Sequence, residues 1–107
     1  MDIDSLQHPL VRAAIQAMNS GDRATWMMLF SEDAVLNDDG SRRDFVSWSD
    51  SELFEANRGE LTTVDRQEDE GRTIYGKFHS SQWGEFKTFM RFHIQNDQIT
   101  RLDLGQA

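Results

Sequence analysis

Asp38 is the residue in this sequence that is best placed to act as a general base. It ends a short apolar segment, residues 34–38, which we expect to be a strand, and the run Asp38-Asp39-Gly40 is typical of a tight turn. A carboxylate at a strand end that faces an aromatic cavity loses hydration, which makes it more basic, and it could then move a proton beside a carbonyl. The same run could also be an ordinary turn in which Asp38 only caps the backbone, and both interpretations stay open.

Other kinds of catalytic or binding chemistry have little support. The chain has no cysteine, which excludes disulfides, thiolate nucleophiles and cysteine-based metal sites. Its three histidines, His8, His79 and His93, lack the spacing of a metal set, and its acidic runs lack the ligand spacing of a calcium loop. No Gly-x-Ser-x-Gly segment could present a nucleophilic serine. We therefore expect no metal and no cofactor.

The balance of charge limits the partners that this chain could bind. It has 11 Lys and Arg residues against 19 Asp and Glu residues, so its formal net charge is -8. Such a field repels phosphate backbones and anionic lipids, and we expect neither nucleic acid nor a membrane as a partner. The first residues are acidic where a secretory signal would be basic, and no long apolar run follows them. We therefore expect one cytoplasmic domain, residues 1–107, since this length suits a single core.

The elements that would position Asp38 begin with strands in the C-terminal half, where apolar and polar residues alternate with the period of a strand. Every second residue from residue 86 to residue 94 belongs to the set Phe86, Thr88, Met90, Phe92 and Ile94. A hairpin centred near Gln82 keeps the apolar residues on one face. It pairs Phe78 with Phe86, Gly76 with Thr88 and Ile74 with Met90.

A second hairpin follows the first. A tight turn at residues 96–97 places Ile94 opposite Ile99. Leu102 and Leu104 then reach the apolar face only if the last strand holds one extra residue, so we expect a β-bulge near residues 100–101.

Three helical patterns precede these strands. An apolar stripe with helical spacing begins after Pro9, a second helix begins at the N-cap Asp22, and a third holds Phe45 and Trp48. The run Ser49-Asp50-Ser51-Glu52 is typical of a capping box, which would break the third helix and start a new turn.

One more strand, residues 61–67, lies between the helices and the hairpins, and its buried face could be either the Leu61/Thr63 set or the Thr62/Val64 set. The order is therefore helix, helix, strand, helix, then four antiparallel strands. This order comes with three local runs. They are Asn19-Ser20-Gly21-Asp22, Phe30-Ser31-Glu32-Asp33-Ala34-Val35 and Ile99-Thr100-Arg101-Leu102-Asp103.

Together, the order and these runs resemble the nuclear transport factor 2-like superfamily and, within it, the SnoaL-like proteins, over nearly the whole chain. The resemblance implies an α+β fold of the cystatin-like roll type: a cone-shaped, curved antiparallel sheet with three N-terminal helices packed on its concave face, usually as a dimer. Members include ketosteroid isomerases, polyketide cyclases, dehydratases and pocket proteins of unknown role, so the fold alone does not choose a function.

The resemblance also places Asp38 where ketosteroid isomerase-like members have their general-base aspartate. The oxyanion donors of those isomerases, a tyrosine and a protonated acid, have no counterpart here. Ala14 stands near the place of the tyrosine, and the inward face of residues 86–95 carries no acid. We therefore favour a pocket protein that binds a small, largely apolar metabolite. The alternatives are an isomerase, cyclase or dehydratase that uses Asp38 as its base, and a structural dimerisation module with a filled cone.

The large residues on the inward faces are the candidate walls of the pocket. They are Trp26, Phe30, Trp48, Phe54, Phe78, Phe86, Thr88, Met90 and Phe92. Each of them could instead be solid core, but as a group they suit an apolar pocket of roughly a few hundred Å³.

The outward face of the sheet carries aromatic residues of its own. Tyr75 and Phe89 should lie opposite each other there, with Arg91 in a charged rim around them. An aromatic centre within a charged rim is typical of a protein interface, so we expect a homodimer through this face.

Overall fold

The computed structural model describes residues 2–55 and 57–107. In this part of the chain, the helices are α1 (Pro9–Ser20), α2 (Arg23–Leu29) and α3 (Phe45–Ser49). The strands are β1 (Phe30–Asp38), β2 (Ser41–Arg43), β3 (Glu60–Glu68), β4 (Thr73–Ser80), β5 (Gly84–Gln95) and β6 (Gln98–Gln106). Short 3₁₀ turns cover Ile3–Ser5 and Asp69–Gly71, and a π-helical turn, Asp50–Phe54, follows α3.

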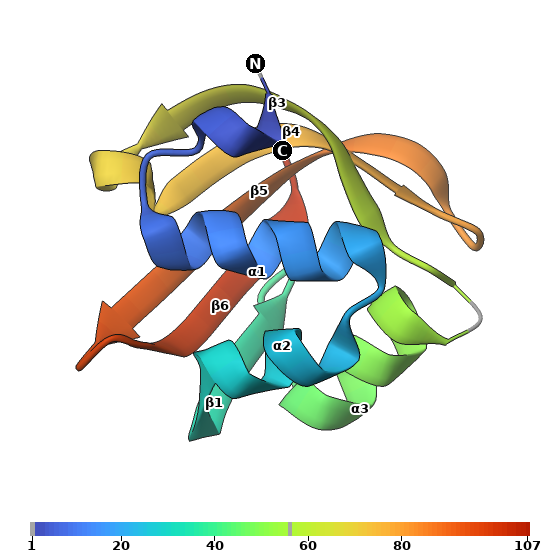
Figure 1. Ribbon diagram of the computed structural model, residues 1–107. Helices are drawn as coiled ribbons and strands as arrows, with labels where there is room; N and C mark the ends of the chain where they lie inside the picture. The colour runs from blue at the N-terminus through green and yellow to red at the C-terminus, as the bar shows by residue number, and fades with distance from the viewer. Residues whose placement is uncertain (1, 56) are drawn as a thin grey trace.

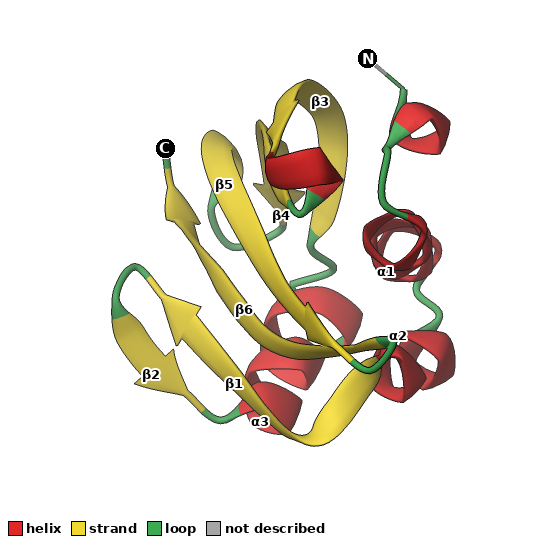
Figure 2. Cartoon of the chain, turned by 90° about the vertical axis from the view of Figure 1, so that its left-hand side faces the viewer, coloured by secondary structure: helices red, strands yellow, loops and turns green. Residues whose placement is uncertain are grey.

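The strands form one bent sheet in the order β2-β1-β6-β5-β4-β3. The helices lie on one side of it, with α1 crossing the sheet and α2 and α3 near its β1 end (Figures 1 and 2). This arrangement confirms the predicted α+β cone. The sheet is mixed rather than purely antiparallel, because β1 runs parallel to β6 while the other neighbouring strands are antiparallel.

The predicted registers of the two C-terminal hairpins are confirmed. Phe78 pairs with Phe86, and Ile74 pairs with Met90. In the second hairpin His93 pairs with Arg101 and the next pair is Ile94 with Ile99, so Thr100 is the extra residue of the expected bulge.

A bulge also settles the buried face of β3. The pairing shifts between Leu61 and Thr63, and both Leu61 and Val64 are buried, so neither of the two predicted sets is the inward one.

The carbonyl of Thr63 approaches Gly76 so closely that a Cβ atom at Gly76 would strike it, which explains the glycine at this position of β4.

A new helical turn does follow Ser49, as predicted, but the predicted capping box does not form. Ser49 has helical backbone angles and caps nothing; the chain continues directly into the π-helical turn. Its buried hydroxyl instead accepts a hydrogen bond from Nε1 of Trp26 at 3.1 Å. The N-cap of this helix is Asp44, whose carboxylate accepts from the backbone N–H of Ser47 at 3.0 Å.

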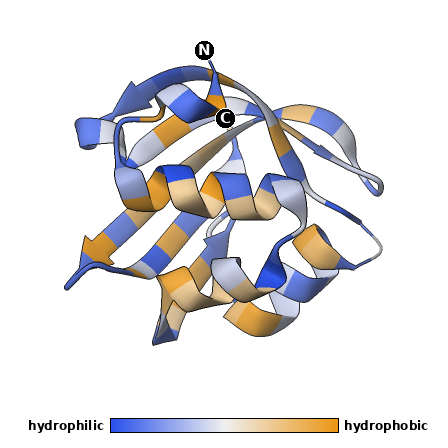
Figure 3. Ribbon diagram, in the orientation of Figure 1, coloured by the Kyte–Doolittle hydropathy of each residue, from blue (hydrophilic) through white to orange (hydrophobic). Residues whose placement is uncertain are grey.

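The core fills the space between α1, α2 and the sheet. Trp26 is fully buried, and its ring lies 4.7 Å from that of Phe30 and 6.2 Å from that of Phe54, centroid to centroid. Phe45 stacks on the same indole at 6.4 Å. Along α1 and the strands apolar positions alternate with hydrophilic ones, as expected for elements with one buried face (Figure 3).

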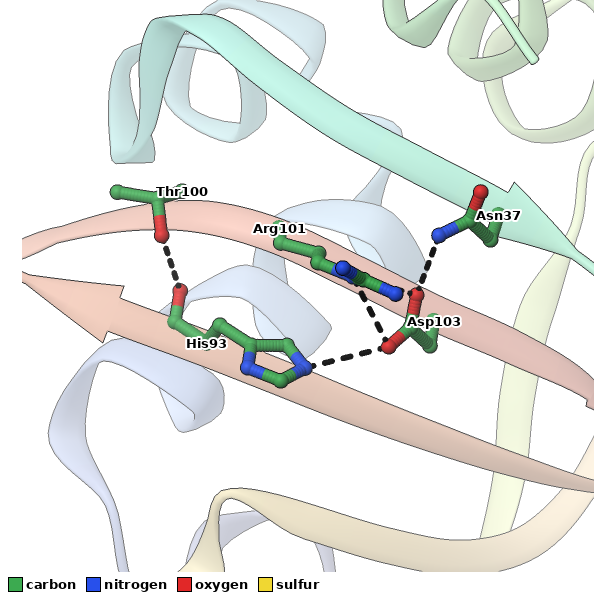
Figure 4. Close-up of polar contacts among 5 residues, drawn as sticks. All are labelled: Asn37, His93, Thr100, Arg101 and Asp103. Carbon is green, nitrogen blue, oxygen red and sulfur yellow. Dashed lines mark hydrogen bonds and ion pairs between the residues drawn. The ribbon is translucent and has the colours of Figure 1, made fainter. Parts of the chain in front are cut away.

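A polar network joins β1, β6 and β5 around Asp103 (Figure 4). One carboxylate oxygen accepts from Nδ2 of Asn37 at 2.8 Å, Nε of Arg101 lies 3.0 and 3.1 Å from the two oxygens, and Nε2 of His93 lies 3.2 Å from the second oxygen. Burial alone would raise the pKa of Asp103, but these hydrogen bonds outweigh it and hold the pKa below its ordinary value of 3.8.

Asp103→Asn is expected to lower the free energy of unfolding by about 1–3 kcal/mol, because it removes charge-assisted hydrogen bonds from a largely buried acceptor. The pKa of Asp103 is depressed in the folded state, so its contribution is present above pH 3.8 and is lost as the pH falls through the folded pKa. Urea unfolding from pH 7 to pH 2.5 should therefore show the two proteins converging. Asp33→Asn, at an exposed position of β1, is the matched control and should change little; an equal loss in both variants would contradict this role.

Candidate functional site

A cavity of about 380 Å³ lies where the end of β1, α3 and the β4–β5 hairpin meet over the concave face of the sheet. Its walls are mainly apolar, and its polar groups come from the β1–β2 hairpin, the π-helical turn and the end of β6. The apolar wall consists of Trp48, Phe78, Phe86, Met90 and Leu104. The polar side chains are Asp38, Asp39, Arg43, Glu52 and Gln106. This size falls within the range of sites for small organic molecules, which is about 300–1,000 Å³.

Asp38 lies at the end of β1, where it pairs with Leu104 of β6 and Ser41 of β2, and its side chain faces the cavity. Its Oδ2 atom accepts a hydrogen bond from Nε1 of Trp48 at 2.9 Å. Trp48 is only 3% exposed, so the indole that holds the carboxylate is itself fixed by packing. Within residues 2–55 and 57–107, no hydrogen bond reaches the other oxygen, Oδ1.

In the Asp38-Asp39-Gly40 run, the side chain that binds the backbone is that of Asp39, not that of Asp38. The backbone N–H of Asp39 donates to the carbonyl of Leu104 at 2.9 Å, and its Oδ1 atom accepts from the backbone N–H of Gln106 at 3.0 Å. A Cβ atom at Gly105 would strike this carboxylate, so the glycine is needed for Asp39 to approach β6. Asp39 therefore ties the turn to the sheet, and the carboxylate of Asp38 is left facing the cavity.

Thr88 lies on the cavity wall, but its hydroxyl is already engaged. It donates to the carbonyl of Gly105 at 2.7 Å, and the residue is buried. Thr88 therefore shapes the wall and offers no donor to a bound molecule.

The candidate pocket residues divide into two groups. Trp48, Phe78, Phe86, Thr88 and Met90 line the cavity. The structure places Trp26, Phe30, Phe54 and Phe92 outside the cavity lining, in or against the packed core.

Several residues of the site were not identified from the sequence. Arg43 lies on β2, which at three residues is too short to show strand periodicity. Glu52 was interpreted as part of a capping box, but it faces the cavity and its Oε2 atom accepts from Nδ2 of Asn57 at 3.1 Å. By contrast, the place of Trp83 beside the expected hairpin turn near Gln82 does indicate either a partner contact or the pocket rim. Trp83 lies on the cavity rim and is 67% exposed.

Across the described part of the chain, no three His, Asp or Glu residues are grouped so that they could hold a metal ion. None of the helices described is both long and apolar enough to cross a membrane.

Comparison with known proteins identifies the fold. No protein-family model and no curated protein matches the chain. Among solved structures, the "putative polyketide cyclase" of Sinorhizobium meliloti superposes with a TM-score of 0.76 and 18% identity over 97% of this chain and 99% of that one. An NTF2-like protein of unknown function from Cytophaga hutchinsonii superposes with a TM-score of 0.71 and 16% identity over 92% of this chain and 87% of that one. The "putative ketosteroid isomerase" of Kribbella flavida superposes with a TM-score of 0.72 and 13% identity over 95% of this chain and 78% of that one. The chain therefore has the cone-shaped α+β fold of the nuclear transport factor 2-like proteins, as the order of its elements predicted.

Proposed function

We propose that this protein binds a small, largely apolar molecule in the cavity beside Asp38. The observation that carries the proposal is the cavity itself, which combines an apolar wall with the oriented carboxylate of Asp38. Such a combination is typical of small-molecule sites, where a few placed polar groups fix the orientation of an apolar ligand. A cavity of about 380 Å³ also speaks against the filled cone of a purely structural module.

The neutral probe 2-naphthol tests this proposal by calorimetry. We expect saturable binding to the wild type and its loss in Leu104→Trp, since Leu104 lines the cavity and a larger side chain there would occupy it. Met28→Trp adds the same side chain at a position that is 75% exposed on α2, and it should bind 2-naphthol as the wild type does. Bound probe should also raise the melting temperature of the wild type and of Met28→Trp only. Equal binding by all three proteins would contradict the proposal.

Catalysis by Asp38 is the second candidate, and its contact with Trp48 is the observation that favours it. A carboxylate held at 2.9 Å by a buried indole is a positioned base, as abstraction of a proton next to a carbonyl requires. The solved structures with this fold include proteins described as a "putative polyketide cyclase" and a "putative ketosteroid isomerase". Against it stands the cavity wall, where the donors of the two buried residues Trp48 and Thr88 are both engaged. The other side-chain donors of the lining belong to Arg43, Trp83 and Gln106, which are exposed.

Deuterium exchange next to the carbonyl of 2-indanone, followed by NMR in D₂O, separates the two candidates. A catalytic base predicts acceleration by the wild type and a loss of about 100-fold or more in Asp38→Asn. A binding protein predicts the same slow exchange with either protein.

We also propose that the protein forms a homodimer through the outer face of the sheet. Tyr75 and Phe89 lie opposite each other on neighbouring strands of that face, both only partly buried. The guanidinium of Arg66 lies 3.9 Å from the centre of the Tyr75 ring and that of Arg91 lies 5.5 Å from the Phe89 ring. Aromatic residues with arginines around them are favoured at protein interfaces.

A further inference from the structure

The hydrogen-bond donors among the cavity's side chains divide into a buried pair on its wall, Trp48 and Thr88, and three on exposed residues, Arg43, Trp83 and Gln106. The indole N–H of Trp48 is engaged by Asp38, and the hydroxyl of Thr88 is engaged by Gly105. The partly buried polar side chains that remain, Asp38 and Glu52, carry carboxylate oxygens, which accept hydrogen bonds and donate none. A ligand group placed there must donate a hydrogen bond, because an acceptor would be left buried without a partner.

The formal charges around the cavity are mostly negative. Asp38, Asp39 and Glu52 line it, with Arg43 as the cation among the described lining residues. Arg43 is exposed, and it forms no ion pair within the described parts of the chain. The whole chain carries a net charge of -8, which attracts cations toward the cavity and repels anions.

The aromatic residues of the wall suit a positive charge as well. Trp48, Phe78, Trp83 and Phe86 surround the same space, and the rings of Phe78 and Phe86 lie 5.6 Å apart. The faces of aromatic rings attract ammonium groups, most strongly where water is excluded. Trp83 on the rim has most of its surface exposed, so a bound molecule could still cover it.

From these three observations we infer that the cavity takes a small organic cation, a protonated amine on an apolar body, with its ammonium group against Asp38. The inference rests on the proposed function, since it names the class of molecule that the same cavity binds. The negative charges of Asp38, Asp39 and Glu52 repel a carboxylate of the same shape. A ketone has only an acceptor oxygen, and the carboxylate of Asp38 offers it no hydrogen-bond donor.

Three probes with one phenylethyl body test this inference: 2-phenylethylamine, 2-phenylethanol and 3-phenylpropanoate. The alcohol can also donate a hydrogen bond to Asp38, but only the ammonium group adds an ion pair. We therefore expect the amine to bind wild type about 10- to 100-fold more tightly than the alcohol, and the acid to bind most weakly. Affinities are measured by calorimetry at low ionic strength, where the contribution of charge is largest.

Two matched variants assign the preference to a residue. Asp38→Asn should reduce the ratio of amine to alcohol affinity to within about threefold of one, while Asp33→Asn, an equal change of charge on the same strand, should leave the ratio unchanged. A ratio that survives in Asp38→Asn, or acid binding as tight as amine binding, would overturn the inference.

The same measurements separate this inference from the proposed function. If the alcohol and the amine bind wild type equally and Leu104→Trp abolishes the binding of both, the proposed ligand cavity is supported and the preference for a cation is wrong. If neither these probes nor 2-naphthol bind the wild type, both are wrong.

Discussion

Trp26→Ala is expected to lower the free energy of unfolding by about 3–5 kcal/mol, the largest effect of any single change considered for this fold. Trp26 is fully buried against Phe30, Phe45 and Phe54, and its indole donates to the hydroxyl of Ser49. Alanine would leave a cavity in the core and a buried hydroxyl without its partner. A domain of this size has a total stability of about 5–15 kcal/mol, so the variant would lose a large share of it.

Phe86→Ala is the matched comparison, because Phe86 is also a large aromatic residue but lines the ligand cavity and is only partly buried. Its loss should cost less, since part of the ring already faces open space. Urea unfolding measures both variants. Equal losses, or a Trp26→Ala protein that keeps its stability and loses only 2-naphthol binding, would place Trp26 on the cavity wall and contradict the division between core and site.

Phe89→Glu is expected to convert a homodimer into monomers. In a two-fold interface each residue occurs twice, so the change would place two carboxylates at the aromatic centre of the interface, and their loss of hydration adds to the lost ring contacts. Light scattering coupled to size exclusion should give twice the 12.4 kDa chain mass for wild type and 12.4 kDa for the variant.

Val46→Glu controls for the effect of a new acid on the molecule as a whole. Val46 is 48% exposed on α3, away from the outer face of the sheet, and its replacement should leave the dimer intact. A wild-type mass of 12.4 kDa, or dissociation of the Val46→Glu protein as well, would contradict an interface at Tyr75 and Phe89.

The parts of the fold that could be predicted from the sequence are those specified by local patterns. The hairpin registers follow from period-two alternation, and a slip of one residue would turn every apolar side chain to the wrong face. The same reasoning located the bulge at Thr100. The parallel pairing of β1 with β6 has no such local pattern, because the two strands are far apart in the sequence and no short turn connects them.

The site was less predictable because it depends on which helical residues reach the end of the cone. Trp26 and Trp48 both lie on helices among apolar neighbours, yet Trp26 enters the core and Trp48 reaches Asp38. Ser49 shows the same limit, since a hydroxyl that suits a capping box was instead used by an indole from another helix. These choices are made by tertiary packing, so a single sequence does not contain a short-range pattern for them.

The most direct test of the ligand cavity uses the three indole N–H signals in a ¹H–¹⁵N NMR spectrum during titration with 2-naphthol. The three tryptophans occupy different places: Trp48 on the cavity wall, Trp83 on its rim and Trp26 in the core. Binding in the cavity predicts that the Trp48 and Trp83 signals shift with one common affinity while the Trp26 signal stays in place. A titration that moves Trp26 and leaves Trp48 unchanged would contradict a binding site beside Asp38.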